Sequence, residues 1–234
     1  MVVIEKGQTM LLDMDTPVLS FLLIKGGTFI FDRKDIHLQA EYIMIVENGT
    51  FTIGSKDDRF EHKAIITLHG HVRSKELPTY GSKVLALREG FLGLYGRHIL
   101  NTWTRINNTV NPGDTQMSLI FAVPDWRVGD EIVIAATGKS MRENEVVFIT
   151  SFSDNFHTLH FKPALVYKHI SLVQTIGGRV VETRAEVGLL TRNILIKGSR
   201  HNEWNDVIKN CPKEFEPGQV KDILLKWPQN FYIK

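Results

Sequence analysis

The chain has 234 residues, of which 43% are hydrophobic and 23% charged, and its formal net charge is +2. This length and composition are those of a globular protein with one large domain or two small ones. The near-neutral charge, without a dense block of lysine and arginine, argues against nucleic acid as a partner, and the lack of a long apolar run predicts no membrane insertion by the chain itself.

The first residues already have the pattern of a folded segment. Directly after Met1, the stretch "VVIEKGQTMLLDMDTPVL" indicates a strand, a turn and a second strand. No basic segment followed by an apolar one, as in a signal peptide, precedes it. We therefore expect either a cytoplasmic protein or a piece of a longer protein.

A short apolar run that ends at a glycine recurs four times in the first ninety residues. The glycines are Gly27, Gly49, Gly70 and Gly90, so the steps are 22, 21 and 20 residues. After three of these glycines, the segments "GTFIF", "GTFTI" and "GFLGL" place apolar residues in the same phase. Counted back from each glycine, the third residues form one predicted ladder, which consists of Ile24, Val46, Thr67 and Leu87.

A strand, a glycine corner and a second strand, repeated in this way, are typical of stacked coils of parallel sheet. Glycine suits a corner because it reaches positive φ without steric strain. The sequence therefore predicts an all-β fold, with a right-handed parallel β-helix over residues 1–110. A β-sandwich is the alternative, because its strands also recur at short intervals, but the in-register ladders argue against it.

Three histidines surround one of these runs in "FEHKAIITLHGHV", residues 60–72. His69 precedes a corner glycine and His71 begins a polar loop, whereas His62 lies at the start of the strand. Metal ligands must converge on bonds of about 2.0–2.3 Å, and a strand of roughly seven residues at about 3.3 Å each separates His62 from the others. We predict no metal site here. His69 and His71 are either ordinary corner residues or part of a ligand groove beside the loop.

Residues 111–170 change to the pattern of antiparallel strands. "DWRVGDEIVIAAT" indicates a turn and a strand, and "NEVVFITSFSDNFHTLHF" indicates a β-hairpin. We predict a small antiparallel β-subdomain, inserted between coils of the β-helix. Trp126 and Asp130 fit a sugar site, because aromatic faces and carboxylates bind carbohydrate. A packing tryptophan and a turn aspartate explain the same pattern.

The coil pattern returns within residues 171–210, in "RAEVGLLTRNILIKGS". Arg184 and Glu186 alternate there with apolar residues, which indicates either an ion-pair ladder on an exposed face or a groove for a long polymer. We assign them, together with the two corner histidines, to one candidate ligand groove. Its members are His69, His71, Arg184 and Glu186. Residues 211–234 are predicted to be a divergent tail.

Other motifs say little about chemistry. Asn48 and Asn107 begin sequons that accept N-linked glycans in a secreted protein. Cys211 is the single cysteine, so no internal disulfide forms, and its pairing with a cysteine outside this chain stays open. The sequence has no nucleophile elbow, metal motif or phosphate loop. We therefore predict no catalytic residues, no cofactor and no metal.

Several stretches, in a fixed order, resemble the G8 domain of the fibrocystin and fibrocystin-like family. They are "GQTMLLDMDTPVL" (7–19), "GGTFIFDRKDIHLQAEYI" (26–43), "FEHKAIITLHGHVRSKELPTYGSKVLALREG" (60–90), "TWTR" (102–105), "DWRVGDEIVIAATG" (125–138) and "RAEVGLLTRNILIKGS" (184–199). The resemblance implies the extracellular part of a cell-surface or ciliary membrane protein. The expected function is non-catalytic recognition of an extracellular protein or a glycosaminoglycan.

The resemblance also leaves alternatives and departures. G8 domains occur in hyaluronan-depolymerising cell-surface proteins, so a fragment of a hyaluronan-binding or hyaluronan-depolymerising protein is the alternative function, with Asp130 or Glu186 as a candidate acid. A structural fragment without its own function is the third. The family continues into further coils after "EFEPG", whereas this chain ends with "QVKDILLKWPQNFYIK". We therefore expect a truncated product, a splice variant or an incomplete gene model, in which Cys211 has lost its partner.

Overall fold

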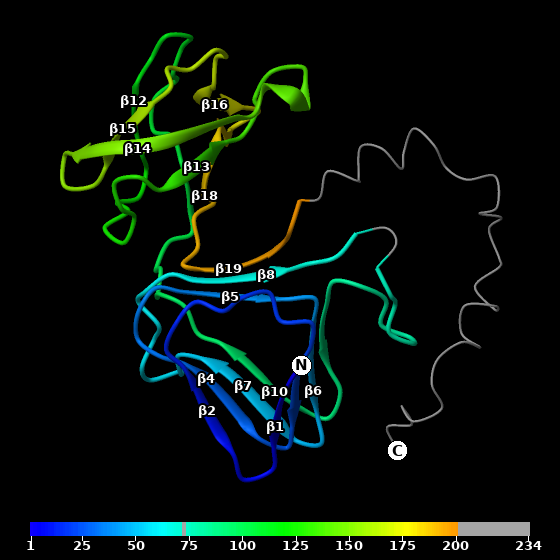
Figure 1. Cartoon of the computed structure of the whole chain (residues 1–234). Coiled ribbons are helices and arrows are strands. Elements are labelled where there is room, and N and C mark those ends of the chain that lie inside the picture. Colours follow the sequence, from blue (N-terminus) through cyan, green and yellow to red (C-terminus); the bar gives the residue numbers. More distant parts are fainter. Residues whose placement is uncertain (72–73, 201–234) are drawn as a thin grey trace, which may run out of the picture. The chain divides into compact units, whose positions relative to one another are not determined.

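The structure is a computed structural model that describes residues 1–71 and 74–200. These residues form strands β1 to β19 and one short 3₁₀ helix, Met141–Glu143, so the prediction of an all-β protein is confirmed. The chain divides into two compact units (Figure 1). Unit 1 contains Met1–Gly96 and the described residues from Asn193 onward, and unit 2 contains Arg97–Arg192. Among the described residues, none belongs to a helix with the length and hydrophobicity of a membrane span.

Unit 1 consists of three parallel sheets, which successive strands of the chain enter in turn (Figure 1). The first sheet contains β1 (Val2–Glu5), β3 (Leu22–Lys25), β6 (Tyr42–Val46) and β9 (Val84–Leu87). The second contains β2 (Thr9–Leu12), β4 (Thr28–Phe31), β7 (Gly49–Ile53) and β10 (Gly90–Leu94). The third contains β5 (Ile36–Ala40), β8 (Ala64–Leu68) and β19 (Ile194–Gly198).

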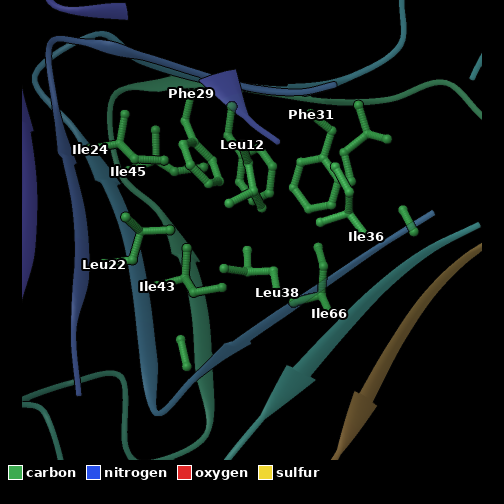
Figure 2. Packing of buried hydrophobic residues seen from close by; sticks show 14 of the residues in the cluster. Leu12, Leu22, Ile24, Phe29, Phe31, Ile36, Leu38, Ile43, Ile45 and Ile66 are labelled. Carbon is green, nitrogen blue, oxygen red and sulfur yellow. The ribbon is translucent and has the colours of Figure 1, made fainter. Parts of the chain in front are cut away.

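The core of unit 1 lies between these three sheets, because alternate residues of every strand point inward. Figure 2 shows Phe29 from the second sheet beside Ile24 and Ile45 from the first, with Leu38 and Ile66 from the third. All five are buried. The ring centroids of Phe29 and of the adjacent Phe51 lie 5.1 Å apart in an edge-to-face arrangement. Stacking of like residues from adjacent strands therefore supplies a hydrophobic core, which one strand from each of the three sheets could not form alone.

Close packing, and not positive φ, requires glycine at Gly27, Gly49 and Gly90, whereas Gly70 has φ of 152°. A Cβ on Gly49 would lie 2.5 Å from the carbonyl oxygen of Ile24, and a Cβ on Gly90 would lie 2.5 Å from the carbonyl oxygen of Gly49. The left-handed backbone falls on neighbouring residues, such as Asn48 with φ of 63°. The predicted reason, positive φ, was therefore wrong for Gly27, Gly49 and Gly90 and correct for Gly70, although the positions mark the corners.

The predicted ladders need a similar correction. Ile24 pairs with Ile45 and not with Val46, because two corner residues precede Gly49 where only one precedes Gly27. The run that ends at Gly70 is β8, which belongs to the third sheet and is not equivalent to the other three runs. The phase after the glycines is as predicted: Phe29 pairs with Phe51, and Phe51 pairs with Leu92.

Unit 2 is built on a six-stranded antiparallel sheet. Its strands, in spatial order, are β11 (Trp103–Arg105), β18 (Glu186–Leu189), β13 (Glu131–Ile134), β14 (Glu145–Ser153), β15 (Thr158–Lys162) and β12 (Gln116–Ser118). A bridge between Ile106 and Leu119 joins the chain just beyond the first and last strands. The N–H of Asn107 donates to the carbonyl of Ser118, which supports the same junction. The sheet therefore closes on itself as a small barrel around its own core.

A two-stranded antiparallel hairpin, β16 (Ser171–Ile176) and β17 (Arg179–Arg184), extends from unit 2 between β15 and β18. The predicted subdomain was residues 111–170, whereas unit 2 runs from Arg97 to Arg192. Of the predicted resumed coil, only β19 lies in unit 1, because β16, β17 and β18 belong to unit 2. The predicted tail, residues 211–234, and Cys211 lie outside the described residues.

Candidate functional site

The two predicted corner histidines lie in unit 1, next to β8. His69 is half-buried, and its Nε2 lies 3.2 Å from Oε1 of Gln39 on β5. Burial, together with the charges of His37 and Lys83, lowers the pKa of His69. The backbone N–H of His71 donates to Oγ of Ser74 at 2.8 Å. His69 is therefore a neutral hydrogen-bonding group at neutral pH and supplies no positive charge for an anionic ligand.

His69 continues a polar row on the outer face of the third sheet. Nε2 of His37 lies 2.7 Å from Oγ1 of Thr67, and the register of the sheet places Gln39, Thr67 and Lys197 side by side. His37 and Gln39 were not predicted as site residues. Their period-two alternation with buried Ile36, Leu38 and Ala40 was the available signal.

The other two predicted groove residues lie in unit 2. The side chain of Arg184 is only 13% exposed. Its Nη1 donates to the carbonyl of Asn107 and to Oγ of Ser171, each at 2.7 Å. Its Nε lies 3.6 Å from Oε2 of Glu182. Arg184 therefore fastens the base of the β16–β17 hairpin to the barrel, and its guanidinium is committed to structure.

Glu186 is exposed and lies directly opposite Arg105 across the β11–β18 pair, so both side chains are on the outer face of the barrel. Nη1 of Arg105 lies 3.8 Å from Oε2 of Glu182. Its guanidinium carbon lies 5.9 Å from the ring centroid of Trp103, within range of a cation–π contact. Trp103 is 52% exposed. We call Trp103, Arg105, Glu182 and Glu186 the Trp103 surface.

The position of Trp103 follows from the local sequence "TWTR". Thr104 is fully buried between two outward residues, as the alternation of a strand requires. Opposite Trp103, β18 carries Gly188, whose missing side chain leaves that side of the indole unobstructed. The sequence alone contained this alternation, but the pairing of β11 with β18 decides which charged groups surround the indole.

The predicted groove is thus divided between the two units. His69 and His71 belong to unit 1, and Arg184 and Glu186 belong to unit 2, so neither unit contains the complete set. Only Glu186 of the second pair is exposed to a ligand.

Trp126 and Asp130 are structural. Trp126 is buried and its Nε1 donates to the carbonyl of Asn101 at 2.7 Å. Asp130 is buried, accepts from the backbone N–H of Arg127 at 2.8 Å, and lies 3.6 Å from Arg97. The packing and turn interpretation therefore explains both residues, and neither is available to a sugar.

A buried ion pair in unit 2 was not predicted. His169 is fully buried; its Nδ1 lies 2.9 Å from the carbonyl oxygen of Ala135, and its Nε2 lies 2.9 Å from Oε2 of Glu145. Glu145 also accepts from the N–H groups of Val166 and Tyr167, at 2.7 and 2.9 Å. Burial of Glu145 favours its neutral form, but these hydrogen bonds and the His169 contact outweigh it and lower the pKa.

This pair has a structural role. Both nitrogens of His169 lie beside oxygen atoms, the carbonyl of Ala135 and the carboxylate of Glu145. The pair fastens the segment around residues 166–169 to β13 and β14 and is closed to a ligand. In the part of the chain that the structure describes, no three histidine, cysteine, aspartate or glutamate residues are grouped so that they could hold a metal ion.

Comparison with known proteins places these features in a family context. Residues 1–107 match the family model of the G8 domain. The chain is 50% identical to human fibrocystin-L over 222 residues, 94% of its length, and 51% identical to mouse fibrocystin-L over 221 residues, 93% of its length. It is 35% identical to dog fibrocystin over 228 residues, 95% of its length. The chain spans only 5% of either fibrocystin-L and 6% of dog fibrocystin.

Proposed function

We propose that the chain is a non-catalytic recognition module in the extracellular part of a fibrocystin-like cell-surface protein, because residues 1–107 match the G8 domain and most of the chain is homologous to a segment of fibrocystin-L and fibrocystin. The observation that carries this proposal is the Trp103 surface. It presents an exposed indole, a guanidinium within cation–π range of it and two carboxylates, Glu186 on the barrel and Glu182 on the hairpin.

The composition of this surface favours a protein partner. Tryptophan and arginine dominate the residues that contribute most to binding at protein interfaces, and they act best when a rigid framework holds them. The barrel supplies that framework, because its sheet is closed and its core is filled. Glu182 and Glu186 outnumber the one cation of this surface, Arg105, whose side chain is 36% exposed, so the surface repels a polyanion and suits a partner with basic groups. A glycosaminoglycan is therefore the weaker of the two expected partners.

Unit 1 acts in this proposal as a rigid support in the form of a right-handed parallel β-helix. The order in which the chain enters the three parallel sheets supports this architecture, since β3, β4 and β5 are followed by β6, β7 and β8 in the same sequence of sheets.

The sequons fit an extracellular location. Asn48 and Asn107 are both exposed, the first at a corner of unit 1 and the second beside the base of the hairpin in unit 2. Both side chains are therefore accessible to a glycan. The chain is proposed to carry N-linked glycans at these two sites when it is part of a secreted or cell-surface protein.

Binding to intact epithelial cells tests the proposal. Fluorescent streptavidin tetramers of the biotinylated chain are compared with tetramers of Trp103→Ala and of Tyr167→Ala, a control that removes another exposed aromatic side chain of unit 2. We expect the wild type and the control to stain cells, and Trp103→Ala to lose most staining. Prior trypsin treatment should abolish the signal, whereas hyaluronidase and heparinase should not.

Other outcomes contradict specific parts of the proposal. Equal staining by Trp103→Ala removes the Trp103 surface as the site. Loss of staining after hyaluronidase or heparinase indicates a glycosaminoglycan ligand. Shortening of added hyaluronan by the purified chain, scored as polymer length on a gel, contradicts the non-catalytic assignment and supports the depolymerising alternative.

A further inference from the structure

The β16–β17 hairpin is exposed beyond its base and carries several aliphatic side chains. Leu172, Val173, Ile176, Val180 and Val181 are all exposed, and Ile176 and Val180 reach 60% and 68%. An isolated two-stranded hairpin is at best marginally stable in water, because it has no layer against which to bury its side chains. Among the described strands, none pairs with the outer edge of β16 or of β17. The base is fixed, since Ser171 and Thr109 exchange hydrogen bonds.

The two edges of the hairpin differ in their protection. β17 carries Arg179, Glu182 and Arg184, and charged side chains on an edge strand oppose pairing with another chain. β16 has the sequence "SLVQTI", which contains no charged residue and no proline. Its edge is therefore open to addition of a further strand.

The register of the hairpin shows which backbone groups that edge presents. Gly177 and Gly178 form a two-residue loop with φ of 56° and 76°, as a type I′ turn requires, and Ile176 lies opposite Arg179. In such a hairpin the pair that flanks the loop is hydrogen-bonded, and bonded and non-bonded pairs then alternate. Val173 and Thr175 are in non-bonded pairs. Their N–H and C=O groups therefore point away from β17, toward the open edge.

We propose that β16 pairs antiparallel with β16 of a second copy of this chain, about a two-fold axis at Gln174, which goes beyond the proposed recognition function. In this register the outward N–H and C=O groups of Val173 bond to those of Thr175 in the second copy. Leu172 lies opposite Ile176 of the second copy on one face, and Gln174 lies opposite its own equivalent.

Symmetry and chemistry select this register. A two-fold axis normal to the sheet keeps every residue on its own face, so paired residue numbers must differ by an even number. Among such registers, the one centred on Gln174 matches the largest aliphatic residues, Leu172 and Ile176, with each other. It also places both outward-pointing residues, Val173 and Thr175, in hydrogen-bonded pairs. The result joins the two hairpins into one continuous sheet with the charged β17 strands on the outside.

Opposite charges at the two-fold axis test this pairing directly. In the proposed sheet the two Gln174 side chains have Cβ atoms about 4.5–5.5 Å apart, a distance at which like charges repel. Sedimentation equilibrium on the unglycosylated full chain should show wild-type protein approaching twice the monomer mass of 26.7 kDa as concentration rises. Q174K and Q174E should each remain monomeric, and an equimolar mixture of the two should recover the dimer.

A proline pair provides the matched control. Thr175→Pro removes an N–H that points toward the open edge of β16, and Val180→Pro removes an N–H that points toward the opposite edge, on β17. Both leave the bonded pairs of the hairpin intact. Thr175→Pro should abolish the dimer and Val180→Pro should retain it, while circular dichroism and the thermal midpoint show that both variants are folded.

The proposal fails on several results. Wild-type protein that stays monomeric up to millimolar concentration overturns it. So does a dimer that survives Q174K and Thr175→Pro, or a mixture of Q174K and Q174E that remains monomeric. Loss of the dimer in Val180→Pro but not in Thr175→Pro assigns the contact to β17 and also overturns it. None of these results depends on whether the Trp103 surface binds cells.

Discussion

Replacement of Glu145 by glutamine tests whether the buried pair with His169 holds unit 2 together. The side chain of Glu145 is 11% exposed and that of His169 is fully buried. Both oxygens of Glu145 accept hydrogen bonds, from His169, Val166 and Tyr167. A glutamine keeps one acceptor oxygen, places an NH₂ donor against another donor, and removes the carboxylate charge from a buried contact.

Removal of one partner of a buried ion pair destabilises a protein by about 3–5 kcal/mol. The variant should therefore lose roughly that much stability, whereas Glu186→Gln, which changes an exposed carboxylate on β18, should alter it by no more than about 0.5 kcal/mol. The measurement is urea unfolding, with hydrogen-exchange protection of residues 131–153 as the probe. This segment belongs to unit 2 and therefore reports on that unit alone.

The lowered pKa of Glu145 predicts the direction in which its contribution to stability changes with pH. The pKa of Glu145 is lowered from its ordinary value of 4.5, so the folded state binds this proton less tightly than the unfolded state. Its stabilising contribution is complete above the unfolded value and is lost as the pH falls through the lower, folded value. As the pH falls below about 4.5, the stability gap between wild type and Glu145→Gln should narrow. A gap under about 1 kcal/mol at pH 7, or one that widens in acid, refutes the reasoning.

Four further substitutions test other parts of the structure. Gly49→Ala puts a Cβ 2.5 Å from the carbonyl oxygen of Ile24, so we expect a loss of about 1–3 kcal/mol in urea unfolding of unit 1. A Cβ on Gly188 would lie 3.5 Å from its nearest atom, so Gly188→Ala should hardly change the stability of unit 2. Equal losses of stability in Gly49→Ala and Gly188→Ala contradict the close-packing argument. Trp126→Ala should cost about 3–5 kcal/mol because the indole is buried. Trp103→Ala should change unfolding by no more than about 0.5 kcal/mol, and a larger loss contradicts its assignment to a binding surface.

The strand content and the corners of unit 1 could be predicted because close packing leaves a mark on the sequence. A glycine is needed where the backbone at one corner touches the next, so Gly27, Gly49 and Gly90 mark successive corners between the first and second sheets. The exact register could not be predicted in the same way. One additional corner residue before Gly49 shifts the pairing of Ile24 from Val46 to Ile45, and equal spacing of glycines does not reveal it.

The boundary between the two units could not be read from alternation. Val187 and Leu189 point inward in a barrel strand, and a strand of a stacked coil has the same period of two. Periodicity reports which side of a strand is buried but not which strands lie beside it. For this reason β18 was expected among the resumed coils, although it pairs with β11 and β13.

The candidate site was predicted only in part, for the same reason. Glu186 is exposed as the alternation indicated, but the burial of Arg184 depends on Asn107, which lies 77 positions away in the chain. The contact between His169 and Glu145 spans 24 positions and has no local pattern. Side chains that meet through pairing of distant strands leave no periodic mark on a single sequence.

The two proposals have a joint consequence for binding strength. A dimer through β16 leaves β17, and with it Glu182 of the Trp103 surface, on the outside of the joined sheet. Each dimer then presents two Trp103 surfaces, and a second contact with the same cell becomes intramolecular, which raises avidity about 10²–10⁴-fold without any new contact. Q174K applied without streptavidin should therefore bind cells far more weakly than wild type, yet match it when both are forced into tetramers. Equal binding of Q174K and wild type, both with and without streptavidin, would mean that self-association does not serve recognition.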